Sequence, residues 1–279
     1  MDALITKDGV ETKLSSLGIL VTDFQDSSPS VYANKREVTN RSGYIFAGAV
    51  HKAKKITVSG LFLANSAYDL EEKKDELNGL ISNDEPFYIT KMLPTTGLYG
   101  FELPGQKTAD FNLLAIPHQA YKYRYKVISE NEISYTFVGK TDAGLLNRFS
   151  VDLTTAELPF GETIPKTLNV TNSIDYKGTA KCSQLEWPWI MKLTSNTSQS
   201  GNISVKVGDR TFIYHAVTPL ANGDILLLKG VETTLNGSNV NDKTNYEHFV
   251  LTPSASKKIT LTTNFKGSIQ LLNFVELYK

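Results

Sequence analysis

Short apolar runs separated by turn-forming residues dominate this chain of 279 residues. The runs are rich in Val, Ile, Thr, Tyr and Phe, and Gly, Asn, Asp and Pro stand between them. Within Lys55 to Leu63, for example, Ile56, Val58 and Phe62 fall on one face of an extended segment, because side chains alternate along a strand. The pattern therefore predicts a mostly β protein whose strands each bury one face.

One segment of the first half has helical periodicity instead. Ser66 stands three residues before Asp69, a spacing that is typical of the start of a helix. The apolar positions that follow recur at helical spacing, and they are Leu70, Leu77, Leu80 and Ile81. Pro86 disfavours helical backbone at the residue before it, so the helix is expected to end near Ser82. We expect a helix over Asp69 to Ile81 that packs one face on a sheet.

The rest of the first half is predicted to contain strands and one irregular segment. Arg124 to Ile128 and Ile133 to Val138 have the composition of two strands paired with each other across a short connection. The segment Leu93 to Gly105 is rich in Gly and Pro and is expected to be a loop or ribbon. Its apolar side chains suggest a surface for a partner, and they are Leu98, Tyr99, Phe101 and Leu103.

The second half of the chain contains short strand-like runs joined by turn sequences, which predicts β-hairpins. Asn236-Gly237 lies between two short strand-like runs and is the strongest two-residue turn signal in the chain, since both residues tolerate positive φ. About eight strands fit between Thr167 and Lys279, enough for a two-sheet sandwich. With a linker near Leu158 to Pro165, the chain is expected to form two domains, residues 1–161 and 162–279.

Composition narrows the classes of function. Lysine plus arginine and aspartate plus glutamate both number 29, so no net charge draws the chain to nucleic acid or to an anionic membrane. Cys182 is the single cysteine, which excludes an internal disulfide and favours an inert small residue. No stretch of eighteen apolar residues and no signal-like N-terminal run occurs, so neither export by that route nor a membrane span is expected.

Motifs for catalysis and for cofactors are not found in the sequence. The four histidines, His51, His118, His215 and His248, lie in no nucleophile or metal-binding pattern, and no phosphate-binding glycine motif occurs. The acidic residues of the predicted helix alternate with lysines, which favours a solvated face. Trp187 and Trp189 could stack on sugars, but we favour packing in the core or at a domain interface. We expect no enzyme activity, cofactor or metal.

The order of features in the first half resembles a known family. Leu17-Gly18-Ile19 is followed by Val38 to Gly43, by the strand and helix described above, and by Glu85-Pro86-Phe87. This order is similar to the N-terminal domain of the distal tail (Dit) proteins of siphophages that infect Gram-positive bacteria. The second half resembles the galectin-like C-terminal domain of that family through Gly223-Asp224-Ile225, Asn236-Gly237, Phe249 and Leu251-Thr252-Pro253.

The resemblance implies a structural role in the virion tail. It implies an N-terminal β-sandwich or split-barrel domain, like a tail-tube protein, with one packed helix, and a galectin-like C-terminal sandwich. It further implies a homo-hexameric ring that joins the tail tube protein to a tail-associated lysin or tip protein and to receptor-binding proteins, while DNA passes through unbound. Arg41, which matches an arginine of the family, and Tyr44 join Leu98, Tyr99, Phe101 and Leu103 as expected interface residues.

Two other classes of function stay open from the sequence. A carbohydrate-binding module would recognise cell-wall sugars through the C-terminal sandwich and requires exposed tryptophans. A β-sandwich glycoside hydrolase would require two carboxylates facing one cleft at catalytic separation, and nothing in the sequence selects such a pair.

Overall fold

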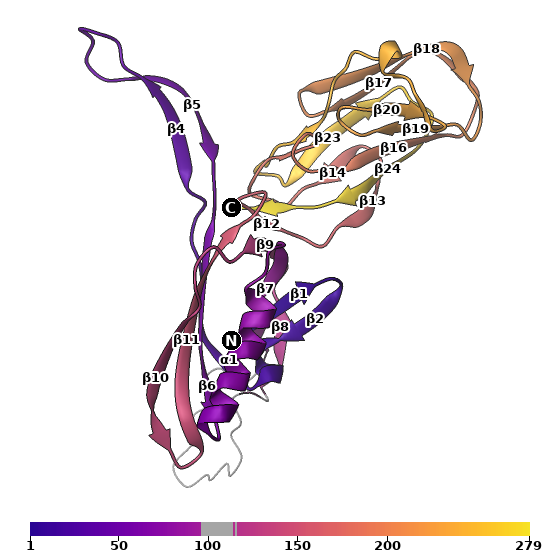
Figure 1. Ribbon diagram of the computed structural model, residues 1–279. Coiled ribbons are helices and arrows are strands. Elements are labelled where there is room, and N and C mark those ends of the chain that lie inside the picture. Colours follow the sequence, from indigo (N-terminus) through magenta and orange to yellow (C-terminus); the bar gives the residue numbers. More distant parts are fainter. Residues whose placement is uncertain (96–113, 115) are drawn as a thin grey trace. The chain divides into compact units, whose positions relative to one another are not determined.

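The computed structural model describes residues 1–95, 114 and 116–279 of the protein. The chain divides into two compact units, Met1–Gly161 and Glu162–Lys279. Strands predominate in both units, and one α-helix is present among the described residues (Figure 1). The mostly β fold class predicted from the sequence is therefore confirmed.

The first unit is built on a nine-stranded sheet and one helix. Seven strands follow one another in the order β2-β1-β7-β9-β11-β6-β3, with β8 beside β7 and β10 beside β11. The elements are β1 Asp2–Lys7, β2 Val10–Lys13, the 3-10 turn η1 Leu14–Leu17, β3 Ile19–Asp26, β4 Val31–Arg36, β5 Ile45–His51, β6 Lys55–Ala64, α1 Ala67–Ile81, β7 Phe87–Pro94, β8 His118–Ala120, β9 Tyr125–Ile128, β10 Ser134–Thr141 and β11 Gly144–Thr155.

Strand β6 and helix α1 form as their patterns predict. Ile56, Val58 and Phe62 of β6 are buried, whereas Thr57, Ser59 and Leu61 on the opposite face are partly exposed. The Ser66 side chain accepts a hydrogen bond from the backbone N–H of Asp69 at 3.1 Å, which caps the helix. The helix packs on the core of the sheet, which includes the buried rings of Phe24, Phe62, Phe87 and Phe149 together with Leu77 and Ile81.

The pairing predicted for the strands after Arg124 is wrong. Strand β9 pairs with β7 and β11, and β10 pairs with β11, so the two are not partners of each other. The reason is β11, whose buried Phe149, Val151 and Leu153 alternate with polar residues over a strand of 12 residues. Because β11 is long enough to form more backbone hydrogen bonds than a short hairpin could, both β9 and β10 pair with it.

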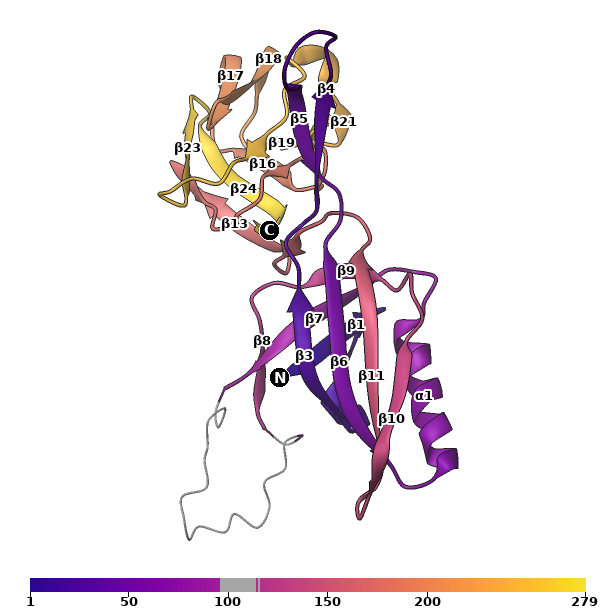
Figure 2. The ribbon, with the colours of Figure 1, turned by 90° about the vertical axis from the view of Figure 1, so that its left-hand side faces the viewer.

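Strands β3, β4, β5 and β6 form one long antiparallel ribbon. Its base, β3 paired with β6, belongs to the nine-stranded sheet. Backbone hydrogen bonds continue the pairing through residues 27–30 and 52–55, with Ser30 N–H donating to the Ala53 carbonyl at 2.7 Å. Its far part, β4 paired with β5, extends out of the sheet (Figure 2). We call residues 31–51 the outer ribbon.

The second unit contains two main sheets. A six-stranded sheet has the order β13-β24-β16-β19-β20-β21, and a four-stranded sheet has the order β14-β23-β17-β18. The elements are β12 Gly161–Glu162, β13 Lys166–Val170, β14 Ser173–Asp175, β15 Cys182–Ser183, β16 Ile190–Ser195, β17 Gln199–Val207, β18 Arg210–Leu220, β19 Ile225–Leu228, β20 Thr233–Leu235, β21 Ser238–Asn239, the 3-10 turn η3 Asn241–Lys243, β22 Val250–Leu251, β23 Lys258–Thr263, β24 Gly267–Phe274 and β25 Leu277–Tyr278.

A two-residue turn forms in this unit at the predicted position. Strands β20 and β21 pair across Asn236 and Gly237, whose φ angles are 49° and 87°. Both values lie in the left-handed region that a two-residue hairpin turn of this type requires. The predicted hairpin at Asn236-Gly237 is confirmed.

Candidate assembly and binding surfaces

The outer ribbon carries many apolar side chains in solvent. The large apolar residues with at least 40% of their surface exposed are Val31, Tyr32, Val38, Tyr44, Ile45, Phe46 and Val50. Val31 and Tyr32 are neighbours in a strand, as are Ile45 and Phe46, so exposed apolar side chains lie on both faces of the ribbon. Among the described strands, β4 and β5 pair only with each other.

The two faces of the ribbon together expose a large apolar surface for a two-stranded element. The seven side chains expose on the order of 700 Å² summed over both faces, so each face carries a share comparable to the largest contiguous patch of a soluble monomer, roughly 300–600 Å². A stable protein interface buries about 800 Å² on each partner. An isolated two-stranded hairpin is also only marginally stable in water. The outer ribbon therefore has the size and chemistry of a surface that a partner covers.

Two of the six interface residues predicted from the sequence lie on this ribbon. Tyr44 is 58% exposed, and the Lys35 ammonium lies 5.6 Å from the centre of its ring. Arg41 is exposed in the connecting turn, where its N–H donates to the Val38 carbonyl at 3.2 Å. The other four, Leu98, Tyr99, Phe101 and Leu103, lie outside the described residues.

A second surface is the solvent face of β3, β6, β10 and β11, which is lined with hydroxyl groups. The Ser59 and Ser150 hydroxyls lie 2.8 Å apart, and the Thr57 hydroxyl donates to Asp152 at 2.6 Å. We call this surface the hydroxyl face. Hydrogen bonds from Lys55 and Thr57 hold the pKa of Asp152 below its ordinary value, so the carboxylate stays charged and neutralises Lys55 at 2.8 Å.

The hydroxyl face ends in a different strand on each side. Strand β3 hydrogen-bonds to β6, and β10 hydrogen-bonds to β11; among the described strands neither has a second neighbour. Each therefore has a row of backbone groups available for pairing. Two unlike edges allow head-to-tail contact between copies, the kind of contact that closes into a ring.

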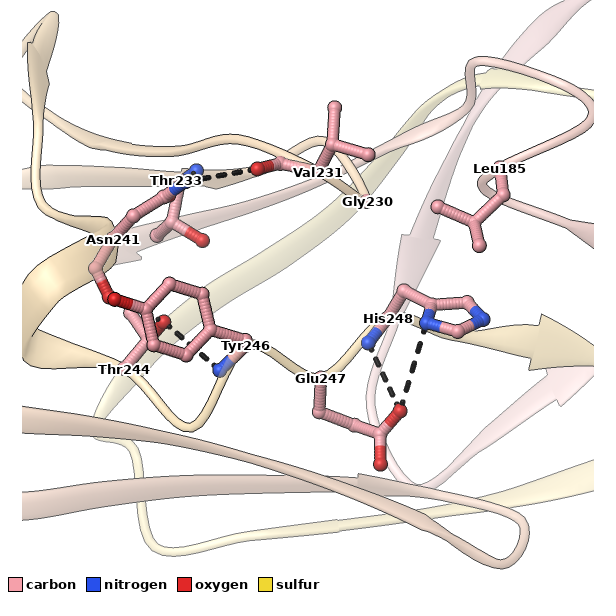
Figure 3. A pocket seen from close by; sticks show the side chains of 9 residues that line it. All are labelled: Leu185, Gly230, Val231, Thr233, Asn241, Thr244, Tyr246, Glu247 and His248. Atoms are coloured by element: carbon pink, nitrogen blue, oxygen red, sulfur yellow. Dashed lines mark hydrogen bonds and ion pairs between the residues drawn. The ribbon is translucent and has the colours of Figure 1, made fainter.

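A third surface is a hollow of about 320 Å³ in the second unit. Figure 3 shows Tyr246 and Leu185 on opposite sides of it, with Glu247 and His248 between them. Tyr246 is 71% exposed and Val231, also on the rim, is 78% exposed. We call it the Tyr246 hollow. Its remaining lining residues are Gly230, Thr233, Asn241 and Thr244.

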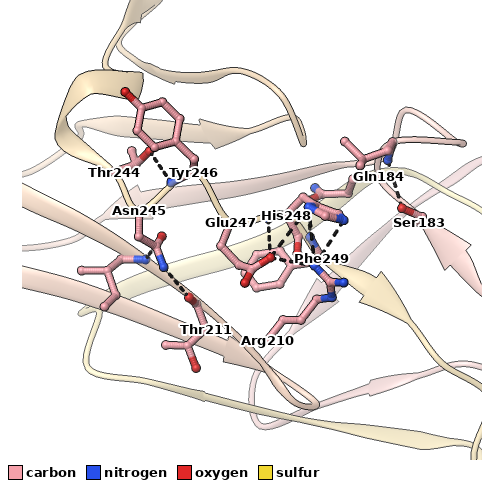
Figure 4. A network of polar contacts seen from close by, with 12 residues as sticks. Ser183, Gln184, Arg210, Thr211, Thr244, Asn245, Tyr246, Glu247, His248 and Phe249 are labelled. Carbon is pink, nitrogen blue, oxygen red and sulfur yellow. Dashed lines mark hydrogen bonds and ion pairs between the residues drawn. The ribbon is translucent and has the colours of Figure 1, made fainter.

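Charged and polar groups beside the Tyr246 hollow form one connected network (Figure 4). Arg210 Nη1 donates to Glu247 Oε1 at 2.7 Å and lies 3.2 Å from His248 Nε2. Behind them, the buried Gln184 side chain donates to the carbonyls of Trp189 and Leu228 and accepts from the N–H of Phe249. This buried amide fixes three segments that surround the hollow.

The two tryptophans do not form an exposed platform. Trp189 is fully buried and stacks on Phe249, with ring centres 6.4 Å apart. Trp187 is half-buried, and its indole N–H donates to the Asn273 carbonyl at 3.0 Å. The packing role that we favoured for the tryptophans agrees with this arrangement. Sequence reasoning did not find Tyr246, because its exposure depends on segments far apart in the chain.

Cys182 is a buried thiol, and groups of metal-binding side chains are also absent from the described residues. Burial raises the pKa of the Cys182 thiol to about 12, so the thiol stays protonated. Among the described residues, no three histidine, cysteine or acidic side chains cluster as metal ligands. Within the same part of the chain, no helix is long and apolar enough to cross a bilayer.

Comparisons with known proteins agree with this fold. Residues 7–136 match the model of the phage tail protein RIFT-related domain. The fold is similar to the crystal structure of the Dit protein (gp 19.1) of phage SPP1, with a TM-score of 0.65 and 14% identity. The match covers 99% of this chain and 99% of the SPP1 protein, which is described as a paradigm of the hub adsorption apparatus in phages infecting Gram-positive bacteria. The baseplate of phage P2 in its activated conformation covers 99% of this chain and 97% of its own, with a TM-score of 0.35 and 7% identity. A sequence search of curated proteins gives no match.

Proposed function

We propose a ring-forming hub function for this chain, whose residues 7–136 match the phage tail protein RIFT-related domain family. This match supports the family resemblance expected from the sequence, and in our proposal the chain is a structural component of the virion tail rather than an enzyme. In our proposal six copies form a ring that joins the tail tube protein to the tail-associated lysin or tip protein.

The exposed apolar surface of the outer ribbon is the observation that carries the proposal. Its two faces each present aromatic or branched side chains to solvent, and covering them on a second copy removes this surface from water. At roughly 25 cal/mol per Å², burial of about 700 Å² corresponds to on the order of 15 kcal/mol before the costs of association. Association itself costs about 4–15 kcal/mol or more, so only the surplus of this burial energy stabilises the contact between copies.

In the proposed ring, strand edges supply the second contact. The β3 edge of one copy pairs with the β10 edge of the next, which continues the sheet around the ring. The hydroxyl face then lines the channel. Its Lys55–Asp152 pair is neutral, and Arg148 adds one exposed positive charge per copy, so few phosphates are neutralised. Because attachment to DNA grows with the number of neutralised phosphates, DNA passes without being held.

The second unit has the outward role in this proposal. Residues 162–279 are the galectin-like sandwich, which reaches away from the channel and contacts receptor-binding proteins. Residues 1–161 form the ring. The support for this division is the fold shared with the SPP1 hub protein over the full chain.

The experiment is the mass of the purified protein in solution by light scattering, with negative-stain electron microscopy of the same fraction. The wild type is expected to form rings, and the double variant Tyr32→Ser/Phe46→Ser is expected to stay monomeric because both faces of the ribbon lose an aromatic side chain. A matched control changes exposed apolar residues elsewhere, Tyr68→Ser/Val217→Ser, which are 75% and 80% exposed. Rings formed equally by both double variants would exclude the ribbon as the interface, and a monomeric wild type at all concentrations would contradict self-assembly.

A further inference from the structure

Tyr246 has a backbone conformation that requires an explanation. Its φ angle is 54°, in the left-handed region where a side chain with a Cβ is disfavoured. Glycine or asparagine ordinarily occupies such positions, and a bulky residue there is an outlier. Yet the ring gains no burial from this conformation, since the residue is 71% exposed. Strain of this kind concentrates at sites that bind ligands.

The residues on both sides of Tyr246 hold it in this conformation. The Asn245 side chain accepts from the N–H of Ile213 at 2.9 Å and donates to the Thr211 carbonyl at 2.8 Å. The Thr244 hydroxyl accepts from the N–H of Tyr246 at 3.2 Å. On the other side, the N–H of Phe249 donates to buried Gln184. The tyrosine ring is therefore presented to solvent on a segment anchored at both ends, which lowers the entropy cost of binding.

The charged groups beside the ring offer both hydrogen-bond donors and acceptors. Glu247 and Arg210 are about one-third exposed as side chains, and they neutralise each other at 2.7 Å. The imidazole of His248 lies 3.7 Å from the Glu247 carboxylate. Of these three residues, Glu247 and His248 line the hollow, and Arg210 contacts both of them without being part of the lining. A neutral ligand with hydroxyl groups can hydrogen-bond to Glu247 and His248, and the Arg210–Glu247 pair carries no net charge to attract an ionic ligand. The network therefore favours an uncharged polar ligand.

The size of the hollow fits a small ligand better than a protein partner. About 320 Å³ lies at the lower end of the range for small-molecule sites, and nine residues line it. A protein interface engages roughly 20–30 residues on each side. The exposed side chains of Leu185 and Val231 bound the hollow opposite the tyrosine and provide apolar contact for the edges of a ring-shaped ligand.

From these observations we infer that the Tyr246 hollow is a binding site for a neutral saccharide. The apolar C–H face of a sugar ring stacks on Tyr246, the Glu247 carboxylate accepts from its hydroxyls, and the His248 imidazole donates to them, while Arg210 holds the Glu247 carboxylate in place. This site uses neither of the tryptophans and does not depend on ring formation by the first unit.

The test uses the full-length protein and a printed array of neutral mono- and disaccharides containing glucose, galactose, N-acetylglucosamine and rhamnose. Hits are measured by saturation-transfer NMR, which detects weak binding and reports the protons that contact protein. We expect at least one hit, with strongest transfer to the C–H protons of one ring face. Tyr246→Ala is expected to weaken binding by at least about tenfold, since it removes the stacking surface.

Two variants control for chemistry and for folding. Tyr68→Ala removes an equally exposed tyrosine in the first unit, at 75% exposure, and is expected to bind as the wild type does. Glu247→Gln keeps the shape of the side chain and is expected to weaken binding while the tryptophan fluorescence of the folded unit stays unchanged. The inference is overturned if no sugar on the array binds, or if Tyr246→Ala binds every hit as tightly as the wild type. Loss of a tail-protein contact in Tyr246→Ala, with no sugar bound, would instead identify a protein-docking surface.

Discussion

Replacing Gln184 should lower the stability of the second unit, because this side chain makes buried hydrogen bonds to its backbone. Its side chain is 4% exposed, and its amide donates to the Trp189 and Leu228 carbonyls at 3.2 and 3.0 Å while accepting from the N–H of Phe249 at 2.9 Å. Gln184→Met keeps the length of the side chain and removes every hydrogen-bonding atom. Three buried backbone groups then lose a partner.

The expected loss follows from the cost of an unsatisfied buried group, about 1–3 kcal/mol each. Allowing for partial relaxation, three groups correspond to about 3–5 kcal/mol, a fifth or more of the roughly 5–15 kcal/mol that stabilises a domain. Urea unfolding followed by tryptophan fluorescence measures this unit alone, because the chain has two tryptophans and both lie in it. With a slope of about 1–3 kcal/mol per molar, the midpoint should fall by about 2 M.

The control is the same substitution at a partly exposed glutamine of the same unit. Gln270 donates to the Asn169 side chain at 2.9 Å on the surface, so Gln270→Met should cost less than about 0.5 kcal/mol. A loss below about 1 kcal/mol for Gln184→Met, or one equal to that of the control, would refute the reasoning that this amide supports the segments around the Tyr246 hollow.

Four further predictions concern single residues. Tyr246→Gly should raise the free energy of unfolding of the second unit by about 0.5–1 kcal/mol, because φ of 54° strains a side chain with a Cβ. The urea midpoint should rise accordingly, and a lower midpoint would contradict this. Gly237→Ala should cost about 1 kcal/mol in the same titration through backbone strain alone, since φ is 87° and the added methyl group meets open space. Cys182 should resist iodoacetamide at pH 8 and react fully in urea, because a pKa of about 12 leaves on the order of one thiol in ten thousand ionised. Burial, then the hydrogen bond to Asp26, raises the pKa of Tyr125 above 10.0, so unfolding releases a proton at higher pH and the stability of the first unit should fall above pH 10. Tyrosine circular dichroism should show a smaller fall for Tyr125→Phe, and an unchanged pH dependence would contradict the assignment.

Local signals in the sequence were sufficient for the elements that depend on near neighbours. The capping of Ser66 and the apolar stripe of α1 involve residues within a few turns of one another, and the Asn236-Gly237 turn is set by two adjacent residues. The partners of β9 and β10 depend instead on β11, which lies further along the chain. The alternation of Phe149, Val151 and Leu153 with polar residues is the sequence pattern that produces this strand.

The surfaces were harder to predict because exposure is a property of the whole fold. The run Tyr44 to Val50 has the composition of a buried strand, and only the structure shows that Tyr44, Ile45, Phe46 and Val50 are exposed on a ribbon that extends out of the sheet of the first unit. The Tyr246 hollow brings together residues between Leu185 and His248 that share no local pattern. Arg41 and Tyr44 were selected through family resemblance, and their role at an interface stays a prediction.

The outer ribbon also has a consequence for how such a protein can change over generations. Only the base of the ribbon, where β3 pairs with β6, contributes side chains to the core of the first unit. Substitutions or length changes within the outer ribbon, residues 31–51, therefore leave the folding energy of the sheet almost untouched, as insertions at a loop tip do. The fold can keep a constant interior while the ribbon adapts to the shape of a changing neighbour, so assembly specificity and stability are free to evolve separately.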